Sequence, residues 1–168
     1  MESYEEYSFG PESFVIFPME KDGNCLFRAM AFFVFNNPNR HHEIRSKLVS
    51  YIADNWHIFQ NYSLKDMEKY RGKMIKPGTF GGDIEIFAFT KFFNCSFKVF
   101  YKHRPKSFPT LYGDSVPQCT SLFSGSWDAG HYDVILPSNK SKMELLLLKR
   151  EMTDLRKRAS KEFEENEQ

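Results

Sequence analysis

The sequence predicts an α+β fold, in which helices and short strands contribute to one hydrophobic core. Cys25–Phe35 is apolar on nearly all sides, as in a buried helix, and His41–Trp56 carries an amphipathic stripe. Cys95–Tyr101 and Gly130–Pro137 are apolar and rich in residues that favour strands. The 168 residues are enough for one domain with a substantial core, and 18 phenylalanines predict that this core is rich in aromatic rings.

Shorter patterns and stop signals predict the remaining elements. Arg45 lies off the apolar stripe of the second helix. Gly78–Gly82 predicts a turn, because it lacks the residue order and the lysine of a phosphate-binding loop. The long irregular stretch 103–126 is typical of a binding loop or a lid. In chain order we also expect a strand over 14–17, a polar helix over 63–74 with Ser63 as its candidate cap, a helix over 83–93, a strand over 119–123 and an amphipathic helix over 141–163.

Composition argues against several classes of protein. A formal net charge of +1 disfavours a general nucleic-acid binder, which would carry a basic excess. Three widely spaced cysteines fit neither a disulfide framework nor a CxxC zinc site, and reduced thiols indicate the cytosol or the nucleus. No apolar run approaches the roughly 18–20 residues that span a membrane, and the N-terminus has no secretion signal pattern. We therefore expect no nucleic-acid partner, no membrane association and no metal or organic cofactor.

Cys25 is the first candidate catalytic residue. Asp22, Gly23 and Asn24 favour a turn, so Asn24 is a candidate N-cap and Cys25 falls in the first helical turn. The free N–H groups and the positive dipole end of a helix favour a thiolate there. The turn also leaves backbone N–H groups near the sulfur, where an oxyanion could bind. The alternative is a buried structural cysteine, and a nearby base would decide between the two.

His131 and Asp133 supply that base. Side chains two residues apart on a strand share a face, so the carboxylate can orient the imidazole and stabilise its cationic form. Tyr132 and Val134 then point into the core. By itself His131 could be an ordinary hydrogen-bonded strand histidine. Together with Cys25 the pair forms the Cys–His–acid arrangement of thiol proteases.

Three blocks resemble the ovarian tumour (OTU) family of cysteine proteases, most of which are deubiquitinases. Asp22–Arg28 (DGNCLFR) resembles the nucleophile motif, Gly78–Ile86 the aromatic–Gly–acid segment that opens a helix, and His131–Asp133 the catalytic histidine strand. The blocks occur in the family's order and extend over most of the chain. One departure is Phe80, where the family usually has tryptophan.

The resemblance implies a papain-like fold of the α/β/α sandwich type, with a small central sheet flanked by helices. Cys25 would be the nucleophile, His131 the acid–base residue and Asp133 its orienting acid, with Asp128 a weaker alternative. Asp22 would act through the shape of the cysteine loop rather than as the orienting acid, and the sequence leaves this open. The backbone N–H groups of 22–25, that is Asp22, Gly23, Asn24 and Cys25, would form the oxyanion hole.

The substrate is likewise implied by the resemblance. Family members cleave the isopeptide bond after the Gly-Gly tail of ubiquitin, so the expected partner is ubiquitin, polyubiquitin or a ubiquitin-like modifier. Trp127, Gly81, Gly82 and Gly130 would line a cleft narrow enough to admit only glycine beside the nucleophile. The alternatives are a catalytically silent ubiquitin-binding adaptor, or a thiol acyl transferase or hydrolase acting on a different substrate.

We expect three parts along the chain. Residues 1–11 form a flexible lead-in, 12–138 an OTU-like catalytic domain, and 139–168 a charged amphipathic helix. Leu145, Leu148, Met152, Leu155 and Ala159 give that helix a spacing of coiled-coil type. We expect it to pack on its own chain, and the alternative is pairing with another chain or another copy.

Overall fold

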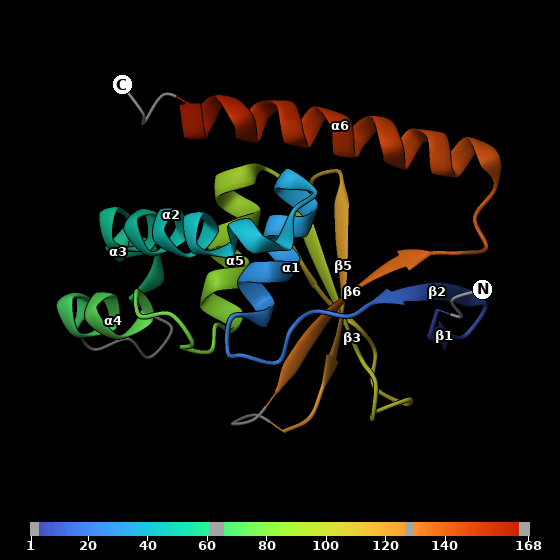
Figure 1. The fold of residues 1–168 in the computed structure, drawn as a ribbon, viewed down its shortest axis with the longest axis horizontal. Helices are drawn as coiled ribbons and strands as arrows, with labels where there is room; N and C mark the ends of the chain where they lie inside the picture. The colour runs from blue at the N-terminus through green and yellow to red at the C-terminus, as the bar shows by residue number, and fades with distance from the viewer. Residues whose placement is uncertain (1–3, 61–65, 127–129, 165–168) are drawn as a thin grey trace.

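A computed structural model describes residues 4–60, 66–126 and 130–164, in which a mixed six-stranded sheet is flanked by helices (Figure 1). The strand order is β1-β2-β6-β5-β3-β4, and the β3–β5 pair is parallel while the other neighbours are antiparallel. This architecture confirms the predicted α+β class. The strands are β1 (Glu6–Phe9), β2 (Glu12–Phe17), β3 (Ser96–Tyr101), β4 (Thr110–Tyr112), β5 (Gln118–Ser124) and β6 (His131–Pro137).

Helix α1 is enclosed by the rest of the domain, which explains its apolar sequence. It contacts β6 on the sheet, α2 beside it, and α6 above it (Figure 1). Helix α5 packs on α2 and continues the helical layer. The helices are α1 (Cys25–Phe35), a 3-10 turn (Pro38–Arg40), α2 (His41–Asp54), α3 (Trp56–Phe59), α4 (Met67–Met74), α5 (Asp83–Phe93) and α6 (Lys142–Glu164).

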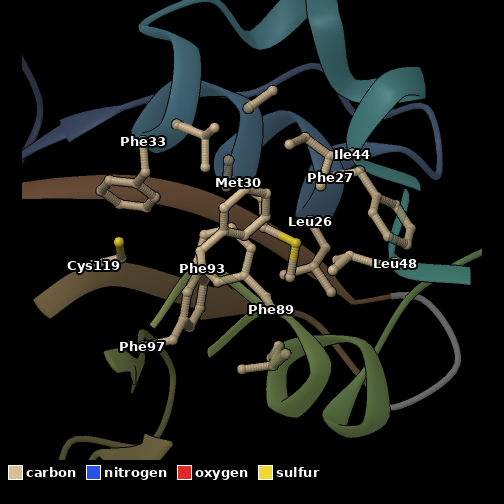
Figure 2. Packing of buried hydrophobic residues seen from close by; sticks show 14 of the residues in the cluster. Leu26, Phe27, Met30, Phe33, Ile44, Leu48, Phe89, Phe93, Phe97 and Cys119 are labelled. Carbon is tan, nitrogen blue, oxygen red and sulfur yellow. The ribbon is translucent and has the colours of Figure 1, made fainter. Parts of the chain in front are cut away.

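The core between the sheet and the helices is rich in aromatic side chains, as the composition predicts. Phe33 of α1 meets Phe97 of β3 edge to face, with ring centroids 6.2 Å apart, and Phe89 of α5 meets Phe97 at 5.8 Å. Figure 2 shows these rings packed around Met30 between the two layers. Edge-to-face pairs add to the stabilisation from buried area, so the aromatic core holds α1 and α5 against the strands.

The first residues of the chain differ from the expected loose lead-in. Glu6–Phe9 forms β1, which pairs with β2 after a turn at Gly10, whose φ is +57°. The rings of Tyr7 and Phe9 pack on Phe100 at centroid distances of 5.9 and 5.4 Å. This contact explains the strand, because a short hairpin gains stability when its apolar side covers the rest of a sheet. The ordered domain therefore begins before residue 12.

Three further predictions need adjustment. The second predicted helix breaks at Asn55, so that α2 ends at Asp54 and α3 follows. The polar helix begins at Met67 with Asp66 as its cap, while Ser63 lies outside the described residues. The irregular stretch 103–126 contains the short strand β4, which the sequence pattern did not predict.

Helix α6 packs on its own chain, as expected, but only along its second half. Leu155 and Ala159 are buried, and the Arg156 guanidinium donates to the carbonyl oxygens of Phe33 and Phe32 at 3.0 and 3.4 Å. In the first half Leu146 and Leu147 are exposed. Within the described part of the chain, no helix is both long and apolar enough to cross a membrane.

Replacing Leu155 with alanine should lower the free energy of unfolding by about 2–5 kcal/mol, the usual cost of a cavity at a buried leucine. Leu155 is 0% exposed, whereas Leu146 on the same helix is 64% exposed and provides the matched control. Leu146→Ala should change stability by no more than about 0.5 kcal/mol. Urea unfolding measures both values, and equal effects would contradict the packing of the second half of α6.

Candidate active site

Cys25 is the first residue of α1, and its sulfur lies against the start of β6. The backbone N–H of Tyr132 donates to Cys25 Sγ at 3.5 Å across 107 positions of sequence. Tyr132 stands between His131 and Asp133, so this contact brings the cysteine to the strand that carries both residues. The thiol is buried, with 1% of the residue exposed.

His131 and Asp133 form a hydrogen-bonded pair on β6. Nε2 of His131 lies 2.7 Å from Oδ1 of Asp133, and the same oxygen accepts a 2.7 Å bond from the backbone N–H of Met19. A carboxylate held from two sides keeps the imidazole in one orientation and leaves Nδ1 for proton exchange. Asp128, the weaker alternative, lies outside the described residues.

Asp22 faces a different partner from the histidine. Its carboxylate is bound by Arg28, with Nη2 to Oδ2 at 2.5 Å and Nε to Oδ2 at 3.2 Å, and Oδ1 accepts the N–H of Asn24 at 3.0 Å. The Arg28 guanidinium holds the pKa of Asp22 well below its usual range. Asp22 therefore binds Arg28 and the backbone of the cysteine loop, and Asp133 is the acid that contacts His131.

Three of the glycines expected to bind substrate line a cleft of about 360 Å³, which Tyr132 also lines but Cys25, His131 and Asp133 do not. Gly81, Gly82 and Gly130 line it together with the exposed ring of Phe80. A Cβ at Gly130 would lie 2.3 Å from the ring of Phe123, so a side chain there would force that ring to move. Trp127, the fourth predicted contact, lies outside the described residues.

Comparison with known proteins agrees with this geometry. A family model described as OTU-like cysteine protease matches residues 20–132. The chain belongs to this family. It is 32% identical over 118 residues to the human (Homo sapiens) UDP-N-acetylglucosamine transferase subunit ALG13, covering 68% of this chain and 10% of that protein. It is 26% identical over 138 residues to OTU domain-containing protein 5-A of Xenopus laevis, covering 82% and 27%. The chain thus spans a small part of the curated relatives it matches.

Solved OTU domains share the fold. The structure of the OTUD1 OTU domain superposes with a TM-score of 0.62 at 25% identity, covering 72% of this chain and 84% of that one. A structure of an ovarian tumour domain in complex with ubiquitin gives 0.64 at 20% identity, covering 88% and 87%. The papain-like OTU fold implied by the sequence motifs is confirmed.

Asn24 departs from its expected role in this OTU nucleophile loop. It stands at the N-cap position of α1, but its side chain makes no capping bond. Asn24 Oδ1 instead accepts from Arg45 Nη2 and from the N–H of Gly78, each at 2.7 Å. Arg45 is the residue that sequence reasoning missed, since it was placed off the apolar stripe and is buried. Its spacing of four from Val49 and seven from Ile52, both buried, was the available signal.

The Cys25 thiol differs from the expectation drawn from the helix start. The N–H groups of Tyr132 and Leu26 lower its pKa, but burial raises the pKa by more, and the carboxylates of Asp133 and Asp22 raise it further. The net direction is upward, because a thiolate loses more by leaving water than it gains from two backbone donors. This direction favours the thiol form of Cys25 at neutral pH.

The rate of Cys25 alkylation by iodoacetamide should keep rising with pH beyond the ~8.5 pKa of a free thiol, because thiolate is the reactive form. Intact mass measured over time from pH 6 to 10 gives the rate, with Cys25→Ala subtracting reaction at other sites. A plateau below pH 7 would show a resting ion pair with His131 and contradict the raised pKa.

Asp22→Asn should destabilise the protein by about 1 kcal/mol at pH 7, the upper range for a two-point Arg–carboxylate pair that is partly exposed. A carboxylate with a depressed folded-state pKa stabilises the protein above its unfolded pKa, and this stabilisation is lost as pH falls toward the folded value. The difference between wild type and variant should therefore shrink from pH 7 to pH 3.

Urea unfolding at both pH values checks this. Glu20→Gln is the control, because Glu20 contacts the same guanidinium at 3.2 Å but its side chain is 72% exposed. Its effect should stay within about 0.5 kcal/mol. An Asp22→Asn effect of equal size at both pH values would mean that charge pairing with Arg28 is not its cause.

Proposed function

We propose that this protein is a deubiquitinase that hydrolyses the isopeptide bond after the C-terminal glycine of ubiquitin. The observation that carries the proposal is the meeting of Cys25 at the start of α1 with the His131–Asp133 pair on β6. Membership of the OTU-like cysteine protease family supports thiol chemistry. Two structural neighbours, a Hazara virus OTU and an ovarian tumour domain, are described as bound to ubiquitin, which supports this choice of substrate.

The first half of the reaction transfers the acyl group to Cys25. Sγ attacks the carbonyl carbon while the thiol proton passes to Nδ1 of His131, and Asp133 stabilises the imidazolium through Nε2. The C=O bond opens to an oxyanion, which backbone N–H groups of the 22–25 loop would bind, except that of Asn24, which donates to Asp22 Oδ1. Such a donor contributes roughly 3–4 kcal/mol to lowering the barrier. His131 then protonates the leaving lysine amine as the C–N bond breaks.

The second half hydrolyses the thioester. His131 takes a proton from water, whose oxygen attacks the same carbonyl carbon, and Cys25 leaves with that proton. The products are ubiquitin with a free C-terminal carboxylate and the restored thiol. These steps use groups of the chain and one water, and the raised pKa of Cys25 makes transfer to His131 part of the attack.

A glycine-ended substrate fits the lining of the cleft. Gly81 lies against α1, where a Cβ would come within 3.0 Å of Leu26 and of the Phe27 ring. Gly130 is equally confined by Phe123. At these two positions the protein itself fills the space that a side chain would need. At Gly82 that space is open, so this part of the cleft wall has room for the extended backbone of a Gly-Gly tail.

The cellular setting proposed from the sequence is the cytosol or the nucleus. Cys25, Cys95 and Cys119 are all buried and unpaired as disulfides. Cys95 and Cys119 pack in the core, and a reduced state suits the catalytic thiol. We also propose ubiquitin or polyubiquitin as the substrate, with a ubiquitin-like modifier as the alternative.

Incubation with ubiquitin carrying a thiol-reactive C-terminal warhead should give one adduct, read by intact mass. The adduct should disappear in Cys25→Ala and persist in Cys95→Ala, the matched control for a buried cysteine outside the site. A folded wild type that forms no adduct would contradict the proposal. The same warhead on a ubiquitin-like modifier then tests whether the protein acts on a modifier other than ubiquitin. A ubiquitin-binding titration tests whether it is a catalytically silent adaptor.

A further inference from the structure

Arg45 of α2 is a buried cation whose hydrogen bonds reach Asn24, the residue before Cys25, and the segment 74–79. Only 2% of the residue is exposed. Nη1 donates to the carbonyl oxygens of Met74 and Thr79, both at 2.9 Å, and Nη2 donates to Asn24 Oδ1 at 2.7 Å. Its guanidinium carbon lies 4.2 Å from the centre of the Phe27 ring. Burying a cation is costly, so these neutral acceptors and the ring compensate for lost water.

The acceptors of Arg45 belong to two backbone segments. One is the nucleophile loop, residues 22–24, which ends at Cys25. The other is residues 74–79, which leads into Phe80 and Gly81 at the cleft. The guanidinium group therefore connects residues 22–24, which precede Cys25, to residues 74–79, which precede Phe80 and Gly81 of the cleft. The two hydrogen bonds of Nη1 hold both ends of the segment 74–79.

The two segments touch each other backbone to backbone. Gly23 has a φ of +80°, and a Cβ there would lie 2.1 Å from the carbonyl oxygen of Gly78. The N–H of Gly78 in turn donates to Asn24 Oδ1, the oxygen that Arg45 also binds. One amide oxygen thus accepts from both sides, and the position of Asn24 is set by Arg45 and Gly78 together.

We propose that Arg45 is a positioning residue for the reaction, holding the 22–25 loop through Asn24 so that its backbone N–H groups point at the developing oxyanion. This inference rests on the proposed function. Asn24 precedes the nucleophile directly, so a rotation of the peptide that joins them would move the N–H of Cys25, whereas the N–H of Asn24 donates to Asp22 Oδ1. A lysine could keep the charge, but a single ammonium has no planar fork to hold two segments at fixed angles.

Arg45→Met should lower kcat about 100-fold with little change in KM, since small misplacement of oxyanion donors acts on the transition state. Arg45→Lys should fall between wild type and Arg45→Met. The matched control is Arg156→Met, which removes another partly buried guanidinium bound to carbonyls, at the opposite end of α1. Arg156→Met should keep kcat within about twofold of wild type, because its contacts do not reach the 22–25 loop.

Two reagents separate positioning from a general loss of structure. Ubiquitin with a C-terminal aldehyde adds to Cys25 as a tetrahedral hemithioacetal, whose oxygen occupies the oxyanion position. Iodoacetamide alkylates the same sulfur by displacing iodide, and no oxyanion forms. Arg45→Met should slow or weaken the aldehyde reaction strongly and leave the alkylation rate near that of wild type, at one pH and on folded protein.

Asn24→Ala provides a second route if Arg45→Met folds poorly, because it removes the shared acceptor and keeps the cation. It should reproduce the selective loss toward the aldehyde, and the double variant should lose little more than either single one.

If wild type reacts with both reagents, and Arg45→Met loses reactivity equally toward both or toward neither, the positioning role of Arg45 is wrong and the proposed function still stands. A wild type that reacts with iodoacetamide but not with ubiquitin aldehyde would overturn the proposed function, and the inference with it.

Discussion

The arrangement of the candidate catalytic residues depends on the packing of the start of α1 against the start of β6. One bond marks this contact, from the N–H of Tyr132 to the sulfur of Cys25. β6 is paired on both edges, with β2 and β5, and α1 is covered by the sheet, α2 and α6. Cys25 and the His131–Asp133 pair thus lie on central elements that are packed on several sides. Sites on such elements are positioned more accurately than sites on free loops.

Local patterns were enough to predict the elements that carry the catalytic residues. α1 and α5 have the predicted bounds, because each is a long, strongly apolar helix whose pattern survives any tertiary context. The strands β1 and β4, of four and three residues, were not predicted. Strand formation depends on what lies across and beneath it, and for β1 the decisive partner is Phe100, more than ninety positions away.

The nucleophile loop shows where local reasoning stops. Asn24 has a strong capping propensity and stands at the N-cap, yet its side chain turns to Arg45 and Gly78. Hydrogen bonds from two donors in distant segments, the charged Arg45 and the N–H of Gly78, stabilise this orientation more than one capping bond to a local N–H would. The sequence shows neither donor as a neighbour. Arg45 alone had a signal in its spacing, which could indicate burial but not which oxygens it would meet.

The same competition decides how Cys25 reacts. The helix start and the N–H of Tyr132 favour the thiolate, while burial and two carboxylates favour the thiol, and burial has the larger effect. Asp133 thereby acts in two opposed ways: it raises the pKa of the thiol, yet it is hydrogen-bonded to His131, which removes the proton in the proposed mechanism. In that mechanism the carboxylate lowers the fraction of thiolate in the free protein, and it stabilises the imidazolium once the proton has moved to His131. In the proposed mechanism the His131–Asp133 pair, rather than the helix start, therefore controls when Cys25 becomes a nucleophile.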